Sequence, residues 1–214
     1  VVKAPQNLTI ADAAALLCAG LTAWSALVTY GKLTAGDTVL VQGTGGVSVF
    51  ALQFAKMLGA RVILTSSDDA KLARGREMGA DDTINYRETP EWHKAVRDLT
   101  GGRGVDHVVE VGGAGTFERS LKSRRAGGVI SLIGVLAGSG QDLNLLPVIM
   151  RNITVQGIFV GHRAGFEQMN RAIELHNMKP VIDRTFAFAD SVEAISYLKE
   201  GKHFGKIAID IADS

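Results

Sequence analysis

The stretch Thr38-Val-Leu-Val-Gln-Gly43-Thr-Gly45-Gly46-Val-Ser48 decides the fold. It opens with a short apolar run of the kind found in the middle of a parallel sheet. Gly43 permits a tight turn, and Gly45 lets the backbone come close to a bulky group. The helix expected next would point its free N–H groups and the positive end of its dipole at the same space, which suits a phosphate. The stretch therefore predicts a dinucleotide-binding turn.

The neighbouring sequence supports this interpretation, because a G-x-G pattern is specific only between a strand and a helix. Arg61-Val-Ile-Leu-Thr65 follows the predicted helix and reads as a second strand. One residue departs from the pattern: Ser48 occupies the position of the usual third glycine. Serine is small, so we expect a slightly wider contact between helix and strand rather than loss of the site. A glycine turn without a nucleotide is the alternative.

Composition limits the class of protein. The chain has 214 residues, of which 46% are hydrophobic and 21% charged, as in a globular protein with a full core. The net charge of +1 gives no indication of a nucleic-acid partner. No apolar run approaches the roughly 20 residues that span a bilayer, and we find no secretory signal. A single cysteine excludes an internal disulfide and fits a reducing compartment, so we expect a cytoplasmic protein without a membrane partner.

Strands and helices alternate through the middle of the chain. The predicted strands cover residues 38–42, 61–65, 82–85, 106–111, 128–133 and 153–159, and the predicted helices cover residues 46–58, 69–78, 91–100 and 115–123. This rhythm predicts an α/β fold with a doubly wound parallel sheet and right-handed crossovers. Ligands of such sheets lie at the carboxyl ends of the strands, where the glycine-rich loop 134–141 is expected.

The two ends of the chain contain further helix signals. Thr9-Ile-Ala-Asp12 predicts a capping box, and residues 13–28 are apolar almost all round, which is typical of a helix buried on most sides. Asp190-Ser-Val-Glu193 predicts a second cap, opening a helix that turns Val192, Ile195 and Leu198 inward. Residues 206–211 read as a final strand.

Several motifs together resemble the medium-chain dehydrogenase/reductase superfamily, in its alcohol dehydrogenase and quinone reductase branches. They are Leu17-Cys-Ala-Gly-Leu-Thr-Ala-Trp24, Gly36-Asp-Thr-Val-Leu-Val-Gln-Gly-Thr-Gly-Gly-Val47, Met78-Gly-Ala-Asp81, Ile84-Asn-Tyr86 and Gly101-Gly-Arg-Gly-Val-Asp106. The resemblance implies a Rossmann domain at residues 31–179, between remnants of a catalytic domain. Residues 1–30 would be one remnant with a linking helix, and residues 180–214 the other. The chain begins Val1-Val2-Lys3, so we expect most of that catalytic domain to precede residue 1.

The preferred cofactor follows from the end of the second strand. An NAD site usually presents an acidic residue there to the ribose 2′-hydroxyl, but this chain has Thr65-Ser66-Ser67. Serines donate hydrogen bonds to a 2′-phosphate that an acid would repel, and Lys71 would add charge. By resemblance, Lys71 and Tyr86 match a lysine and a tyrosine of NADP-dependent reductases. We therefore expect NADP(H) rather than NAD(H), and we expect the nearby Asp68 and Asp69 to cap the next helix.

Further cofactor contacts come from the resemblance alone, beyond the turn residues Gly43, Thr44, Gly45, Gly46 and Val47. It places Gly112 and Gly113 beside the ribose and nicotinamide, and His203 near the nicotinamide end. It also places two groups of residues along the nicotinamide: Ile133, Gly134 and Val135, and Phe159, Val160 and Gly161. The alternatives are a solvated charge for Lys71, a half-buried loop aromatic for Tyr86 and a surface histidine for His203.

The metal question depends on Cys18. Its Leu-Cys-Ala-Gly context resembles that of the cysteine that ligates catalytic zinc in alcohol dehydrogenases. Zinc needs at least three protein ligands, yet the chain has no second cysteine and its five histidines show no ligand spacing. We therefore expect a buried structural cysteine and no metal or zinc among these residues. A zinc-dependent alcohol dehydrogenase with Cys18 as a ligand is the alternative.

The predicted activity is hydride transfer between NADPH and a small carbonyl or an activated alkene. The catalytic acid and base are expected before residue 1. The sequence argues against a short-chain dehydrogenase, because none of Tyr30, Tyr86 and Tyr197 has a lysine four residues later. The non-enzyme alternative is a nucleotide-bound structural or regulatory module. Residues 154–159 should form an edge strand, and the resemblance implies that two such edges pair in a homodimer.

Overall fold

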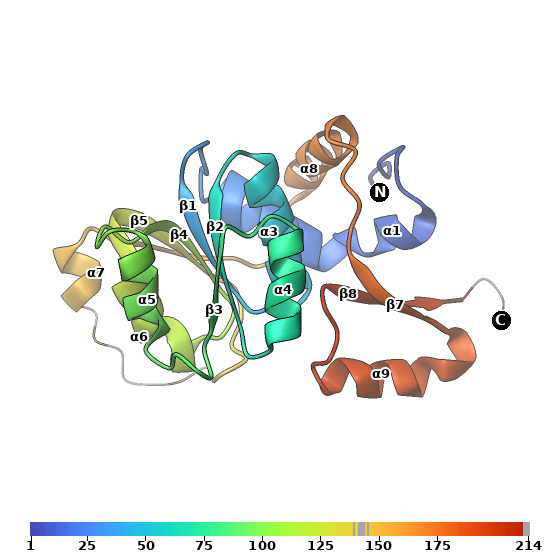
Figure 1. Ribbon diagram of the computed structural model, residues 1–214. Helices are drawn as coiled ribbons and strands as arrows, with labels where there is room; N and C mark the ends of the chain where they lie inside the picture. The colour runs from blue at the N-terminus through green and yellow to red at the C-terminus, as the bar shows by residue number, and fades with distance from the viewer. Residues whose placement is uncertain (139, 141–143, 145, 212–214) are drawn as a thin grey trace.

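The computed structural model describes residues 1–138, 140, 144 and 146–211. A parallel six-stranded sheet in the order β3-β2-β1-β4-β5-β6 forms its centre (Figure 1). This order is that of the dinucleotide-binding Rossmann fold and confirms the predicted doubly wound sheet. The strands are β1 Thr38–Gln42, β2 Arg61–Ser66, β3 Asp82–Asn85, β4 Val105–Glu110, β5 Arg124–Leu132 and β6 Thr154–Gly157. No helix within the described part of the chain is long and apolar enough to cross a membrane.

Helices follow the strands as predicted. They are α3 Gly46–Met57, α4 Asp69–Glu77, α5 Trp92–Leu99 and α6 Ala114–Ser123, with the short α7 Leu146–Met150 between β5 and β6. The helix α7 was not predicted from the sequence, and the predicted start of β5 lies four residues after the observed one. The early part of β5 is separated by a register shift, because Arg124 pairs with Val105 whereas Val129 pairs with His107. The predicted loop 134–141 lies partly outside the described residues.

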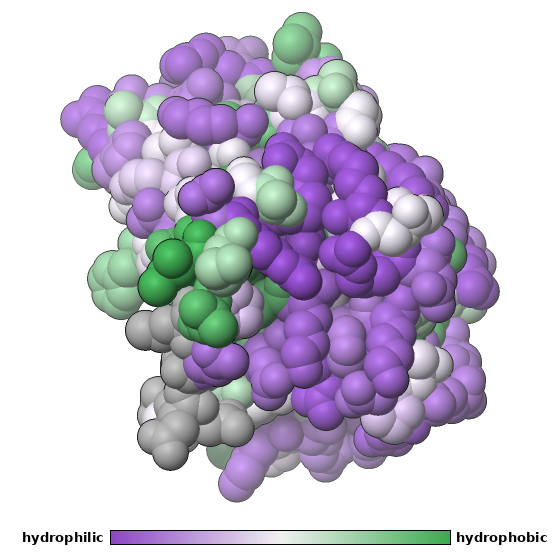
Figure 2. Space-filling model, turned by 90° about the vertical axis from the view of Figure 1, so that its left-hand side faces the viewer, coloured by the Kyte–Doolittle hydropathy of each residue, from purple (hydrophilic) through white to green (hydrophobic). Residues whose placement is uncertain are grey.

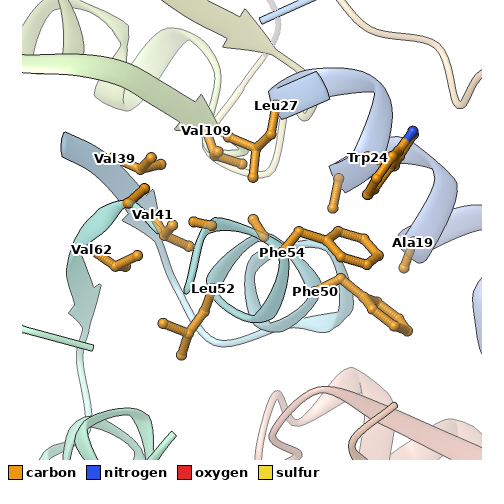
Figure 3. Close-up of a cluster of buried hydrophobic side chains, with 14 of the residues drawn as sticks. Ala19, Trp24, Leu27, Val39, Val41, Phe50, Leu52, Phe54, Val62 and Val109 are labelled. Atoms are coloured by element: carbon orange, nitrogen blue, oxygen red, sulfur yellow. The ribbon is translucent and has the colours of Figure 1, made fainter. Parts of the chain in front are cut away.

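The amino-terminal helical segment packs beneath the glycine turn. It consists of α1 Ile10–Ala14, the π-helical turn η1 Leu16–Gly20, α2 Leu21–Trp24 and a second π-helical turn η2 Ser25–Thr29. Thr9 and Asp12 form the predicted capping box. In the core, the Trp24 ring meets Phe54 edge-on at 5.2 Å between centroids, and Phe50 stacks on Phe54 at 5.9 Å (Figure 3). These contacts fix the segment against α3.

The prediction that this segment is buried on most sides holds only in part. Leu16, Trp24 and Leu27 are buried, but Leu17 is 65% exposed. Leu17 faces away from α3, beside the exposed Ile10, in a surface hollow that both residues line.

The carboxyl-terminal part forms a smaller unit beside the main sheet (Figure 1). It contains β7 Ile182–Ala187, the 3₁₀ turn η3 Phe188–Asp190, α9 Ser191–Lys199 and β8 Lys206–Asp210. The helix α8 Arg163–Leu175 precedes this unit and packs against α2, with Met169 and Ile173 in the main core. Strands β7 and β8 pair in parallel as a two-stranded sheet.

The prediction for α9 was wrong about which side chains are buried. Val192, Ile195 and Leu198 are exposed by 79%, 62% and 47%, and Ala194 is the buried residue of this helix. Asp190 makes no side-chain cap. The two-stranded sheet offers α9 only a narrow surface, so the small Ala194 faces it and the larger apolar side chains face outward.

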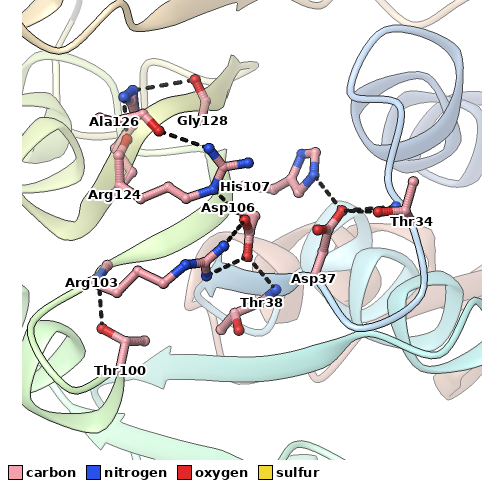
Figure 4. A network of polar contacts seen from close by, with 12 residues as sticks. Thr34, Asp37, Thr38, Thr100, Arg103, Asp106, His107, Arg124, Ala126 and Gly128 are labelled. Carbon is pink, nitrogen blue, oxygen red and sulfur yellow. Dashed lines mark hydrogen bonds and ion pairs between the residues drawn. The ribbon is translucent and has the colours of Figure 1, made fainter.

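A polar network closes the amino end of the sheet (Figure 4). The buried Asp106 carboxylate accepts from the backbone N–H of Thr38 at 2.9 Å, from Arg103 at 2.7 and 3.0 Å, and from Arg125. Burial alone would raise the pKa of Asp106, but the hydrogen bonds from Arg103 and Arg125 hold that pKa well below its ordinary value. The network therefore joins β1, β4 and β5 at the amino-terminal end of the sheet, opposite the end that carries the glycine turn.

Candidate cofactor-binding site

The glycine turn after β1 has the geometry of a phosphate cradle. Gly43 adopts the left-handed conformation (φ +73°), and its N–H donates to the carbonyl of Thr65 at 2.8 Å. Gly45 precedes α3 without a side-chain cap, which leaves the first N–H groups of the helix available. A Cβ added to Gly45 would meet nothing within 4 Å. Free donors, a positive helix end and open space together fit a bound diphosphate.

Ser48 replaces the expected third glycine without disrupting the turn. The residue is buried, and its hydroxyl donates to the carbonyl of Gln42 at 2.6 Å. This bond ties the first turn of α3 to the end of β1. Serine at this position therefore contributes a contact that glycine lacks.

A cavity of about 630 Å³ opens above the turn. It brings together residues from β2, α4, the loop after β5 and the carboxyl-terminal unit, and none of the described residues that line it is acidic. The predicted cofactor residues among its walls are Gly43, Thr44, Gly45, Gly46, Val47, Ser66, Ser67, Lys71, Tyr86, Ile133, Gly134 and His203.

The acidic residues after β2 are engaged elsewhere. Asp68 caps α4 by accepting from the backbone N–H of Lys71 at 3.1 Å, which confirms the predicted cap. Asp69 accepts from the side-chain amide of Asn85 at 2.8 Å. The Lys71 ammonium instead lies at the cavity, where it donates to the carbonyl of Gly201 at 2.5 Å. Lys71 is thus a positioned side chain rather than a freely solvated one.

The loop between α9 and β8 closes over the glycine turn. The N–H of Gly205 donates to the carbonyl of Thr44 at 2.9 Å, which places His203 in the cavity wall. Burial and the neighbouring Lys71 ammonium lower the pKa of His203. Lys206, which the sequence analysis missed, lays its aliphatic chain over the start of α3, since a Cβ on Gly46 would lie 2.8 Å from the Lys206 Cδ.

A second cavity of about 470 Å³ adjoins the first. Gln42, Gly43, Tyr86, Val111 and Leu136 line both cavities. Gly112, predicted beside the ribose, lies here rather than in the larger cavity. The wall residues that were not predicted include Pro90, Trp92, Thr116 and Arg119. They come from segments with no motif of their own.

The remaining predicted residues line neither cavity. Gly113 has a structural role, because its φ of +82° and its closeness to the Gly138 carbonyl exclude a side chain. Gly161 packs against Ser25 with no room for a Cβ. Phe159 is 97% exposed. Val135 and Val160 also lie outside the two sets of wall residues.

The expectation of a buried structural cysteine was wrong, because Cys18 is exposed. Within the described part of the chain, no three His, Cys, Asp or Glu residues group closely enough to hold a metal ion. The one thiol therefore has no companion ligands there, and these residues do not form a zinc site by themselves.

Comparison with known proteins gives the family. Residues 46–175 match the model of the family described as zinc-binding dehydrogenase. A zinc-type alcohol dehydrogenase-like protein of Schizosaccharomyces pombe is 42% identical over 98% of this chain and 62% of its own length. A 2-haloacrylate reductase of Burkholderia is 28% identical over 97% of this chain and 66% of its own length. The chain thus spans less than two thirds of these relatives.

Solved structures agree with this assignment. A Sinorhizobium meliloti protein assigned as an alcohol dehydrogenase superposes with a TM-score of 0.91 and 47% identity, over 98% of this chain and 61% of that one. An NAD-dependent alcohol dehydrogenase superposes with a TM-score of 0.91 and 36% identity, over 99% of this chain and 62% of that one. The chain therefore belongs to the zinc-binding dehydrogenase family, within the medium-chain dehydrogenase/reductase superfamily.

Proposed function

We propose that the protein binds NADP(H) in the two adjoining cavities. We further propose that the full-length enzyme transfers hydride between NADPH and a small carbonyl or an activated alkene. The observation that carries this proposal is the 630 Å³ cavity, which joins the glycine turn to Ser66, Ser67 and Lys71 and has no acidic residue among its described walls. When bound, the nicotinamide supplies the hydride chemistry. The relatives support a redox function, and one mycobacterial structure, 31% identical, is complexed with NADPH.

Each part of the site has a proposed role in binding. The first N–H groups of α3 hold the pyrophosphate, and Lys206 adds positive charge beside them. Ser66, Ser67 and Lys71 hold the 2′-phosphate, because hydroxyl and ammonium donors suit phosphate oxygens. The second cavity takes the adenine base between Trp92 and the turn after β4, since it has aromatic and apolar walls.

The test is titration of the purified protein with NADPH and then NADH, followed by nicotinamide fluorescence, in the wild type and in Ser66→Asp. We expect the wild type to prefer NADPH. The variant should lose about tenfold or more of its NADPH affinity through like-charge repulsion, whereas NADH affinity changes little. Ala73→Asp places the same charge on an exposed position of α4 outside the cavity walls and should leave both affinities unchanged. Equal wild-type affinity for the two cofactors would refute the 2′-phosphate assignment.

Turnover separates the enzyme from a nucleotide-bound module without activity. We expect the full-length protein to oxidise NADPH with at least one member of a panel of quinones, enones and aldehydes. Activity that survives dialysis against a chelator would support hydride transfer without zinc over the alternative in which Cys18 is a ligand.

We also propose the domain organisation expected from the resemblance. Residues 31–179 form the cofactor domain, and residues 1–30 and 180–214 belong to the catalytic domain. The exposed apolar side chains of α9 support this division, because helices with such faces usually pack against another element.

A further inference from the structure

Glu110, the last residue of β4, has a fully buried side chain and directly precedes Val111, which lines both cavities. Its Oε1 accepts from the backbone N–H of Gly112 at 2.8 Å and of Gly113 at 3.0 Å. The same oxygen accepts from the hydroxyl of Thr116 at 2.6 Å. One carboxylate oxygen therefore holds the whole turn between β4 and α6.

The second oxygen of Glu110 reaches the neighbouring strand. Oε2 accepts from the side-chain amide of Gln42 at 2.8 Å and from the hydroxyl of Ser120. Gln42 ends β1, lines both cavities, and accepts from the N–H of Val111 at 3.4 Å through its own oxygen. The carboxylate thus connects the ends of two adjacent parallel strands at the point where the cavities meet.

The loop after β5 rests on the turn that Glu110 holds. The N–H of Ala137 donates to the carbonyl of Gly112 at 2.6 Å, and the N–H of Ala114 donates to the carbonyl of Gly138 at 2.9 Å. The backbone carbonyl of Glu110 accepts from Ile133 at 2.9 Å. A shift of the turn would therefore move the loop that carries cavity residues such as Ile133 and Leu136.

We propose that Glu110 is a positioning residue of the cofactor site. Its carboxylate holds Gln42, which lines both cavities, and the Gly112–Gly113 turn, whose Gly112 lines the smaller one, and it contacts no cofactor itself. This inference rests on the proposed function. The side chain of Glu110 reaches none of the 2′-phosphate residues Ser66, Ser67 and Lys71, so it should set affinity for NADPH and NADH alike.

The same strand supplies a matched control. Asp106, four residues before Glu110, is also a buried carboxylate with several donors, but it lies at the opposite end of β4. Loss of either carboxylate leaves buried donors unpaired and lowers stability. Only Glu110 bonds directly to residues that line the cavities, Gln42, Gly112 and Thr116, so only its substitution should change binding beyond the effect on stability.

The experiment compares Glu110→Met, Glu110→Gln and Asp106→Asn by thermal unfolding and by titration with NADPH and NADH. Methionine has a side-chain volume close to that of glutamate but offers no oxygen acceptor. The Glu110→Met variant should therefore bind NADPH and NADH each about tenfold more weakly, with the ratio of the two affinities unchanged. Gln keeps one oxygen for the turn amides and should restore affinity to within about threefold of the wild type. Asp106→Asn should lower the unfolding temperature while leaving both affinities unchanged.

The outcomes separate this inference from the proposed function. A wild type that binds neither cofactor would overturn the proposed function. A wild type that binds, with wild-type affinity also in Glu110→Met, would overturn the positioning role alone, and so would equal weakening by Asp106→Asn. If Glu110→Met does not fold, Glu110→Asp replaces it. The aspartate side chain is one methylene shorter, so its carboxylate lies further from the backbone amides of Gly112 and Gly113. Unchanged cofactor affinity in Glu110→Asp would equally refute the positioning role.

Discussion

At the scale of single residues, two glycines of the same turn have different functions. Gly43 has a φ of +73°, a conformation that costs an L-residue roughly 1–2 kcal/mol. Gly45 has an extended φ of −78° and open space around its absent Cβ. Gly43 therefore serves the fold, whereas Gly45 leaves open the space that we propose for the cofactor diphosphate.

We predict opposite results for alanine at these two positions. Gly45→Ala should leave the unfolding temperature unchanged or slightly raised, because its backbone conformation suits alanine. It should nevertheless weaken cofactor binding about tenfold, since the methyl group projects into the space assigned to the diphosphate. Gly43→Ala should lower the free energy of unfolding by about 1–2 kcal/mol. Thermal unfolding and fluorescence titration measure both effects, and wild-type binding by Gly45→Ala would contradict the placement of the diphosphate.

At the scale of elements, β4 carries a buried acid at each end, and the one at its amino end makes stability depend on pH. Hydrogen bonds from Arg103 and Arg125 outweigh burial and lower the pKa of Asp106 in the folded state. The unfolded state then binds protons more readily than the folded state as the pH falls. The stabilisation is complete above the ordinary carboxyl pKa, near 3.8, and is lost as the pH falls through the lower folded-state pKa.

We therefore predict that Asp106→Asn lowers the free energy of unfolding by about 2 kcal/mol at pH 7. The difference from the wild type should stay constant down to about pH 4 and then shrink towards about pH 2, because the unfolded chain takes up a proton there that the folded aspartate does not bind. Urea unfolding across this range measures the effect. The control is Asp98→Asn on the exposed side of α5, which should show little difference from the wild type at any pH. A constant difference for Asp106→Asn would show that packing, rather than charge, determines its contribution.

At the scale of the whole molecule, the exposed edge of the sheet favours self-association. β6 is the last strand of the sheet, as predicted, and Val155 is 37% exposed on it. Leu146, Ile149 and Met150 of the adjacent α7 are also exposed. Figure 2 shows a small apolar patch on this side of the molecule, whose surface is otherwise mostly hydrophilic. Unpaired strand edges with apolar neighbours readily pair with another chain.

We propose a homodimer through this edge and predict a light-scattering mass twice the 22.7 kDa of the chain. Val155→Lys should convert the dimer to single chains, because a charged edge strand resists pairing. Thr83→Lys places the same charge on β3, the opposite edge of the sheet, and should leave the mass unchanged. A wild-type mass of one chain would refute the dimer.

The sequence by itself determined the elements whose signals are local. The bounds of β1 and β3 were predicted to the residue, and so were the caps at Thr9 and Asp68. Apolar runs, glycine turns and capping side chains act over a few neighbouring residues, so they can be recognised without the fold. The alternation of these elements was sufficient for the parallel sheet and for the position of the glycine turn after β1.

Only the tertiary structure decided which distant residues share the site. Lys71 meets Gly201 across 130 positions, and Gln42 meets Glu110 across 68. The exposure of Cys18 and of the apolar face of α9 likewise depends on which elements cover them, which periodicity does not specify. Sequence patterns describe what a segment presents along its own length, whereas burial and convergence depend on how separate segments pack in space.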